Sequence, residues 1–447
     1  MFDVVIRNAK LVLEDRVMDG TLAINGGKIA AIIDSSVNVQ GKRVLDYEGC
    51  YVLPGAIDTH SHVTFCDSFE NGSKAAVAGG VTTIIEMPLS MHLETVLDET
   101  TFQERIHMGE KECVGDFALW AGVQPENYKN VSRLCELGAV GFKVFMSYAG
   151  ENYRSFNDDD LHLLMREASR CGALVGIHAE NDAICDGSTK RVRAQGGGAE
   201  AFSQCRPVLS EKEAVIRACL YAQETGCRVH ICHVSSPDVA AIIEHFKQHG
   251  AKISFETCPH YLLLTEKDIA KYGTYAKCNP PMRSREEMES YWDRVEKGRV
   301  DCIGTDHATY SDEQKSVEFF SAPGGFPGID LMVPALLDEG VVKRKIPWTV
   351  MAQMLSTRPS KFFHLDHCKG AIRVGLDADL AIVSPSTLWR FRANESFYGV
   401  KSEHYPYENR EMSCKVLATL VRGCVVYENG QIQVADGYGK FVKSTVK

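Results

Sequence analysis

Residues 53–62 read LPGAIDTHSH, a short apolar run that ends in a pair of histidines. Further short apolar runs follow as far as about residue 370, and stretches with helical periodicity lie between them. The apolar runs cover residues 81–85, 117–121, 139–144, 174–178, 229–233, 252–256 and 302–305, and the clearest helical stretches cover 161–168, 212–223 and 239–246. Seven or eight strand–helix units in succession predict a parallel sheet, and this number favours an α/β fold whose sheet closes into a (β/α)8 TIM barrel.

The two ends of the chain differ from this pattern, because both are rich in short β-type segments. Residues 2–12 are β-rich, and a hairpin is predicted at 21–32 around the turn Asn25-Gly26-Gly27. Residues 378–383 and 416–426 return to the same pattern. We therefore expect a small β-sandwich domain built from both chain ends. Its predicted residues are 1–52 and 372–447, and the barrel is predicted at 53–371.

The composition is that of an ordinary globular protein, with 45% hydrophobic and 24% charged residues in a chain of 447. The net charge of −10 gives no indication of a nucleic acid or an anionic membrane surface as a partner. No apolar run approaches the length of a membrane span, and Asp3 stands where a signal peptide carries bases. The sixteen cysteines include no C-x-x-C pair, which predicts reduced thiols. These features together predict a cytoplasmic protein.

Residues with metal-ligand chemistry stand at the ends of four predicted strands. They are His60 and His62 after the first strand, His178 and His233 at the ends of two later strands, and Asp306 after the last. The C-terminal ends of barrel strands meet at one mouth, so these groups are expected to converge there. A single histidine is more often a surface or core residue, but five such groups in one register are improbable as coincidence. Imidazole and carboxylate ligands suit Zn²⁺ first, with Mn²⁺, Co²⁺ or Fe²⁺ as alternatives.

Lys143 is unusual because it ends the apolar strand predicted at 139–144. A charged amine in such a place is costly unless it is paired. Two explanations are open from the sequence alone. The ammonium group forms a salt bridge with a nearby acid, which is the default, or a neutral amine reacts with carbon dioxide. The second reaction gives a carbamate whose two oxygens bridge two metals.

Five motifs occur in a fixed order: DTHSH at 58–62, GFK at 141–143, HAEN at 178–181, HVSS at 233–236 and GTDH at 304–307. Together they resemble the cyclic amidohydrolases of the amidohydrolase superfamily, a group of allantoinases, hydantoinases, dihydropyrimidinases and dihydroorotases. The resemblance covers nearly the whole chain and implies a metal-dependent hydrolase with two divalent cations, zinc foremost. It implies that His60, His62 and Asp306 hold one cation, that His178 and His233 hold the other, and that N6-carboxylated Lys143 bridges them.

The resemblance also implies catalytic and substrate-binding roles. A hydroxide that bridges the metals attacks the ring carbonyl, and Asp306 acts as the general base. Tyr148 matches the tyrosine that donates to the oxyanion in hydantoinases and dihydropyrimidinases, and the alternative is an aromatic residue packed at a loop edge. Main-chain groups of Asn279, Gly324 and Gly325 are expected against the imide atoms of the ring, although a plain loop explains the glycines equally well.

The motifs as a whole match allantoinases best, which implies hydrolysis of allantoin to allantoate in purine metabolism. Tyr148 and the segment Ala308-Thr309-Tyr310, where allantoinases typically have Ser-Pro-Cys, depart from that group. A hydantoinase or dihydropyrimidinase is therefore the alternative. Dihydroorotase is disfavoured, because residues 62–65 and 87–90 lack the groups that grip its substrate carboxylate.

For allantoin, the polar residues at 309–315, in a long loop predicted at 309–327, are the expected partners of the ureido arm. The relatives also imply a homo-oligomer, either a dimer or a tetramer. A non-catalytic scaffold homologue is the remote alternative, and the complete set of metal-ligand residues argues against it.

Overall fold

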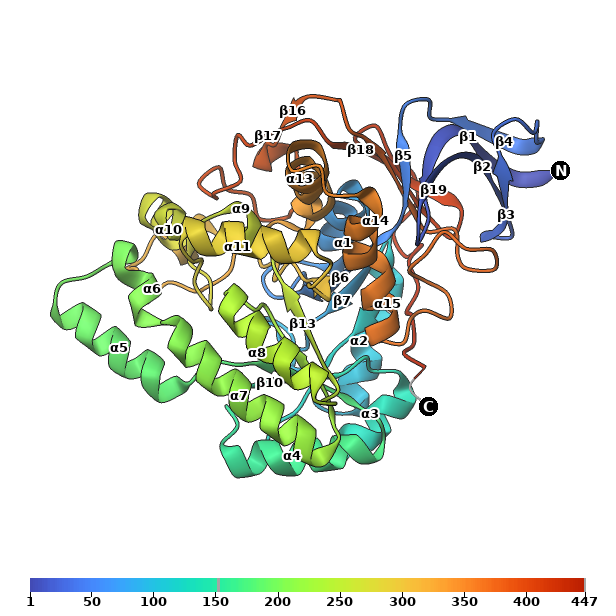
Figure 1. The fold of residues 1–447 in the computed structure, drawn as a ribbon. Coiled ribbons are helices and arrows are strands. Elements are labelled where there is room, and N and C mark those ends of the chain that lie inside the picture. The colour runs from blue at the N-terminus through green and yellow to red at the C-terminus, as the bar shows by residue number, and fades with distance from the viewer. Residues whose placement is uncertain (151–152, 446–447) are drawn as a thin grey trace.

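The computed structural model describes residues 1–150 and 153–445. A parallel barrel with helices around it makes up most of the molecule, and a β structure built from both chain ends lies at one side (Figure 1). Residues 446–447 of the predicted terminal domain lie outside the described residues, and the division of the chain at residues 52 and 372 stays a prediction.

The barrel strands run parallel and follow one another in sequence order. They are β6 (Ala56–Ser61), β7 (Val81–Glu86), β8 (Asp116–Leu119) with its continuation β9 (Ala121–Gly122), β10 (Phe142–Phe145), β11 (Leu174–His178), β12 (Arg228–Ile231), β13 (Ile253–Thr257) and β14 (Cys302–Ile303). The first and last strands meet where the Asp306 amide donates to the His60 carbonyl at 2.8 Å and where Ser61 bridges His307. The sheet is therefore closed, and the fold is the TIM barrel that the sequence predicts.

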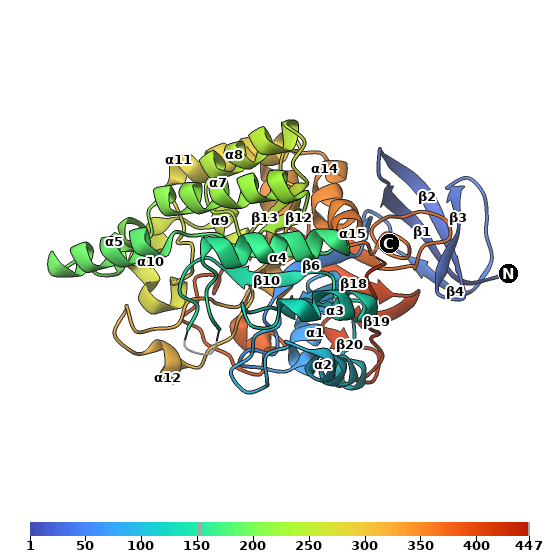
Figure 2. The ribbon, with the colours of Figure 1, turned by 90° about the horizontal axis from the view of Figure 1, so that it is seen from below.

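Helices lie outside the barrel and bury one face each against it (Figure 2). The main ones are α1 (Phe69–Ala78), α2 (Glu99–Glu112), α3 (Val131–Leu137), α4 (Asp158–Arg170), α7 (Val208–Thr225), α8 (Pro237–Gln248), α11 (Arg285–Glu296), α13 (Met332–Leu337), α14 (Trp348–Ala352) and α15 (Arg358–Phe362). In α4 the buried apolar residues 161, 164, 165 and 168 follow the helical period, and the Asn157 side chain caps the first turn by accepting from the Asp160 amide.

The chain ends share one nine-stranded sheet, in which β5 (Tyr51–Pro54) joins the two ends. On one side, β5 pairs in parallel with β1 (Phe2–Val12), which is followed by β2 (Val17–Asn25) and β3 (Lys28–Asp34), while β4 (Gly41–Asp46) pairs with β1. On the other, β5 pairs antiparallel with β15 (Leu380–Ser384), which is followed by β18 (Lys415–Val421), β19 (Cys424–Glu428) and β20 (Gln431–Ile432). Side chains from both ends of the chain, such as Ile6 and Leu420, share one hydrophobic core.

A buried ionic network connects the start of barrel strand β8 with the terminal sheet. Lys369 Nζ lies 2.5 Å from a carboxylate oxygen of Asp116 and 2.5 Å from one of Asp379, and 3.1 Å from Asp377. The Arg422 guanidinium donates to Asp116 as well. These contacts connect the barrel and the terminal sheet through charges that are largely buried.

All sixteen cysteines are free thiols, most of them buried, in agreement with the prediction of reduced cysteines. Among the described residues, no helix is long and apolar enough to cross a membrane.

Candidate metal centre

The first group of predicted ligands converges where β6 and β14 end. His60 is the fifth residue of β6, and His62 follows directly after the end of that strand. His60 Nε2 lies 3.2 Å from His62 Nε2, and each of these nitrogens lies 3.3 Å from Asp306 Oδ1. Three lone-pair donors from two strands therefore face one small space, as a cation requires.

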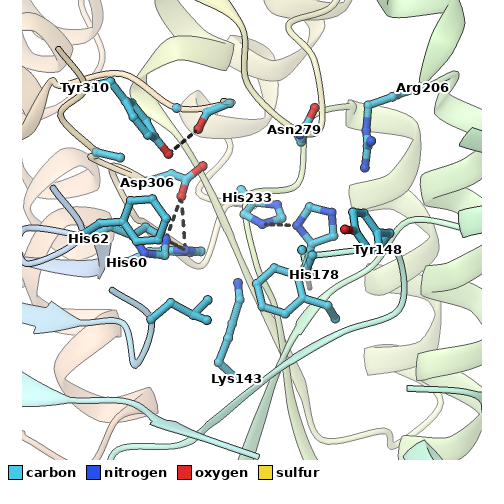
Figure 3. A pocket seen from close by; sticks show the side chains of 18 residues that line it. His60, His62, Lys143, Tyr148, His178, Arg206, His233, Asn279, Asp306 and Tyr310 are labelled. Carbon is cyan, nitrogen blue, oxygen red and sulfur yellow. Dashed lines mark hydrogen bonds and ion pairs between the residues drawn. The ribbon is translucent and has the colours of Figure 1, made fainter. Parts of the chain in front are cut away.

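The second group lies beside the first. His178 is the last residue of β11, His233 follows β12, and His178 Nδ1 lies 3.0 Å from His233 Nε2. The ring centroids of His60 and His233 are 5.3 Å apart, so the two groups adjoin (Figure 3). The structure thus brings together all five imidazole and carboxylate residues that the sequence analysis singled out.

Lys143, on β10, points into the space between these two groups (Figure 3). Its Nζ is buried, has neither a hydrogen-bond partner nor an ion-pair partner within residues 1–150 and 153–445, and lies 5.0 Å from the centre of the Phe145 ring. The salt bridge that was the default explanation is therefore absent from the described part of the chain. An amine with no partner, set between two groups of ligand atoms, fits the bridging carboxylate of a dinuclear centre.

Two of these residues adopt a backbone conformation that is uncommon for residues other than glycine. His233 has φ +37° and Asp306 has φ +51°, both in the left-handed region. Each follows the end of a barrel strand, where the unusual φ turns the side chain back over the mouth. Conformations of this kind cost free energy and occur preferentially at functional sites.

Two buried glutamates that the sequence analysis did not identify hold the imidazoles. Glu256, on β13, lies 2.5 Å from His60 Nδ1 and accepts from the His233 amide at 3.3 Å. Glu180 lies 2.9 Å from His178 Nε2 and is itself held by Arg206, whose Nε lies 3.0 Å from both carboxylate oxygens. A carboxylate behind an imidazole fixes the ring orientation and the tautomer that presents the opposite nitrogen to a metal.

The sequence did contain a signal for both glutamates. Glu256 ends a predicted apolar strand, in the same way as His178 and His233 end theirs, and Glu180 follows His178 by two residues. Nothing in the spacing indicated Arg206, because its side chain reaches Glu180 from a separate segment between helices.

The electrostatics of the site favour the protonation states that bind metals. Burial, together with the nearby Lys143 charge, lowers the pKa of His60 to about 4. Burial also lowers the pKa values of His178 and His233. Burial alone would raise the pKa of Asp306, but the facing imidazoles, His60 foremost, hold it below its usual range. At neutral pH the imidazoles of His60, His178 and His233 are therefore neutral and the Asp306 carboxylate is ionised.

The ligand groups form the floor of a cavity of about 350 Å³, a volume that suits a small ring. Tyr148, Asn279, Gly324 and Gly325, the predicted substrate-binding residues, all line it. The Tyr148 side chain is 67% exposed and lies beside His178 (Figure 3).

The cavity wall also contains residues that were not predicted to line it: Phe65, Leu89, Phe145, Ala149, Gly150, Arg206 and Ala308. Of the loop residues at 309–315, which were expected to reach a ureido arm, only Tyr310 lines the cavity. Gln314 and Lys315 instead bond within the protein. A short helix, α12 (Asp312–Lys315), interrupts the predicted loop, because the Ser311 hydroxyl caps it.

Comparisons with known proteins agree with this geometry. The model of the amidohydrolase family matches residues 51–426. The L-hydantoinase of Paenarthrobacter aurescens is 33% identical over 453 residues, which cover 99% of this chain and 98% of that protein. The allantoinase of Deinococcus radiodurans is 35% identical over 437 residues, which cover 96% of each chain. A solved L-hydantoinase (dihydropyrimidinase) structure from Arthrobacter aurescens superimposes with a TM-score of 0.95 at 32% identity, over 99% of this chain and 100% of that one.

Proposed function

This chain belongs to the amidohydrolase family and is a cyclic amidohydrolase, and from that premise we propose that it opens the five-membered ring of allantoin to give allantoate. The observation that carries the proposal is the arrangement of His60, His62, His178, His233 and Asp306 around the unpartnered amine of Lys143. Such a site suits the hydrolysis of an amide bond, and the cavity above it suits a small cyclic ureide.

The residues fit two divalent cations, with zinc first by ligand type. His60, His62 and Asp306 would hold one, His178 and His233 would hold the other, and Lys143 carboxylated on Nζ would join them. When bound, such a pair lowers the pKa of a water molecule and polarises a carbonyl. We also propose a homo-oligomeric, cytoplasmic enzyme, as the sequence analysis expects.

The protein's own residues would then handle protons and charge. Asp306 takes a proton from the attacking water and delivers it to the ring nitrogen as the carbonyl carbon–nitrogen bond breaks, so that a carboxylate and a free ureido nitrogen result. The hydroxyl of Tyr148 reaches the cavity and would donate to the oxygen of the carbonyl under attack. The Gly324–Gly325 turn and the main chain of Asn279 would hold the rest of the ring.

Two polar groups in the cavity support allantoin as the substrate. Asn279 Oδ1 is buried and accepts no hydrogen bond from the described residues, and the guanidinium of Arg206 lines the same cavity. A ureido arm carries N–H donors and a carbonyl acceptor, so it complements an unpaired amide oxygen together with a guanidinium group. These groups replace the 309–315 loop as the candidate partners of the arm.

A different observation favours a second candidate, a hydantoin with an apolar substituent. Phe65, Leu89, Phe145 and Tyr310 form an apolar part of the cavity wall. An alkyl or aryl group at the 5-position of a hydantoin ring would bury apolar surface there, whereas the ureido arm of allantoin would gain nothing from it.

One experiment separates the two candidates. Purified enzyme with about two metal ions per chain is assayed with allantoin, 5-benzylhydantoin, dihydrouracil and dihydroorotate. Asn279→Leu removes the side-chain amide and keeps the main chain, so it should lower kcat/KM for allantoin roughly 10-fold or more relative to 5-benzylhydantoin. Leu89→Ala is the matched control. It should lower kcat/KM for 5-benzylhydantoin relative to allantoin. Turnover of substituted hydantoins without allantoin would favour the second candidate, and no turnover of any ring would reject catalysis.

A further inference from the structure

A lysine is buried behind the Gly324–Gly325 turn of the cavity without a counter-ion. Lys315, at the end of α12, is fully buried. Its Nζ donates to three main-chain carbonyls: Thr274 at 3.1 Å, Pro323 at 2.9 Å and Gly325 at 2.7 Å. No carboxylate within residues 1–150 and 153–445 forms an ion pair with it.

A second buried lysine, Lys277, binds main-chain carbonyls of the segment that precedes this turn. Lys277 Nζ donates to the carbonyls of Phe319 at 2.9 Å, Phe320 at 3.1 Å and Ala322 at 2.5 Å. Burial lowers the pKa of Lys277 to about 8 and that of Lys315 to about 7. Keeping two ammonium groups away from water is unfavourable, and the three carbonyls around each offset that cost.

The two lysines hold different parts of one loop. Lys277 binds carbonyls of residues 319–322, which do not line the cavity, whereas Lys315 binds the Gly325 carbonyl, whose residue does. Gly325 has φ +109°, and a Cβ atom on it would lie 3.2 Å from the Ala308 Cβ. The conformation of the turn is thus one that only glycine adopts readily.

Hydrogen bonds fix this turn on both sides of the Gly324–Gly325 peptide. The Tyr310 hydroxyl donates to the Gly324 carbonyl at 3.0 Å, and the Gly325 amide donates to the Lys277 carbonyl at 2.8 Å. The Lys315 ammonium group completes the set by binding the Gly325 carbonyl, and it lies 4.7 Å from the centre of the Tyr310 ring. Lys315 thus contacts the turn and Tyr310, both of which face the substrate space.

We propose that Lys315 is a positioning residue for substrate binding, whose ammonium group holds the Gly324–Gly325 turn and the Tyr310 ring at the wall of the reaction cavity. It does not touch the reacting atoms. The proposal rests on the proposed function in that the turn has to contact a ring substrate. Lys315, which lies behind the cavity wall, thus affects the affinity for substrate and not the chemical step.

The test compares two lysine variants of the metal-loaded enzyme that remove the same kind of group. Lys315→Met is expected to raise KM for the ring substrate roughly 10- to 100-fold, with kcat within about threefold and metal content unchanged. Lys277→Met loses an equal number of hydrogen bonds but should raise KM less than about threefold. Hydrogen–deuterium exchange should quicken at residues 324–326 in Lys315→Met, and at 319–322 in Lys277→Met.

An unchanged KM in Lys315→Met, or equal increases in both variants, would overturn the proposal. If Lys315→Met does not fold, Lys315→Gln, which retains two N–H donors, should give an intermediate KM, and a wild-type value would again overturn it. Failure of the wild-type enzyme to open any ring would reject the proposed function instead. The exchange pattern would then decide separately whether Lys315 holds the turn.

Discussion

A buried amine without a partner raises the free energy of the folded protein, and Lys143 is such a group at the centre of the cavity floor. The cost disappears if Nζ carries a carboxylate that binds metal. The same side chain then both completes the centre and loses its own penalty. Substitutions of Lys143 and of Asp306 test this arrangement at the scale of single residues.

Lys143→Ala should lose most of the bound metal and nearly all activity, because the bridging group is removed with the side chain. Short carboxylic acids such as acetate or propionate should restore part of both, since they can occupy the vacated volume. Metal content by elemental analysis and turnover with and without the acids give the measurement. Full activity in this variant would exclude a bridging role for Lys143.

Asp306→Asn should reduce kcat by roughly 10²- to 10⁴-fold and leave KM within a few-fold, because proton transfer contributes in the transition state. The assay has to be made on protein whose metal content equals that of the wild type, since Asp306 is also a predicted ligand. If kcat survives within a few-fold under that condition, the general base lies elsewhere.

The predicted ligands could be found from the sequence because each stands at the end of an apolar strand, and barrel topology brings strand ends together. The supporting residues follow no such rule. Arg206 comes from an irregular segment, and its role depends on the position of Glu180, which is known only after the strands are paired. The contacts of Lys315 cannot be predicted from the sequence either, because its three acceptors are main-chain carbonyls, which every residue type has.

At the scale of elements, strand β13 contributes no ligand to the cavity but supports two of them through Glu256. In the register of the sheet Glu256 is level with His178, two strands away, and with Cys232, the residue before His233.

Glu256→Gln should weaken metal binding by roughly 10- to 100-fold, because an amide is a poorer acceptor for the His60 ring N–H and leaves that imidazole less basic. Competition with a chromophoric chelator measures the affinity without any need for turnover. Glu289→Gln on helix α11, where the side chain is half exposed, is the matched control and should bind metal as the wild type does. Equal affinity in both variants would show that Glu256 does not support the centre.

Element boundaries were predicted less well than element types. Residues 416–426 were expected as one β-rich stretch, but they form the hairpin of β18 and β19, because Arg422 and Gly423 both adopt positive φ angles and turn the chain. An arginine in that conformation gives no signal in a sequence pattern. By contrast, β1 and β11 begin and end at the predicted residues.

At the scale of the whole molecule, the ionic network around Lys369 ties the barrel to the terminal sheet. Lys369→Met should lower the free energy of unfolding by about 3–5 kcal/mol, because the buried carboxylates of Asp116 and Asp379 would lose the cation that they share, and only Asp116 would keep a second one, Arg422. Denaturant unfolding gives the value. Lys361→Met, an exposed lysine on α15, should change it by less than about 1 kcal/mol. Similar stability in both variants would show that the network contributes little.

The pairing of β5 with β15 has a consequence for how the protein is made. Residues 51–54 leave the ribosome early, but their partners at 380–383 emerge about 330 residues later, which at 5–20 residues per second is roughly 20 seconds to a minute. Throughout that interval β5 presents an open, apolar strand edge of the kind that pairs with other chains. We therefore expect the nascent N-terminal strands to be the part of this protein most prone to aggregation during synthesis, and the yield of soluble product should rise when nascent chains meet one another less often.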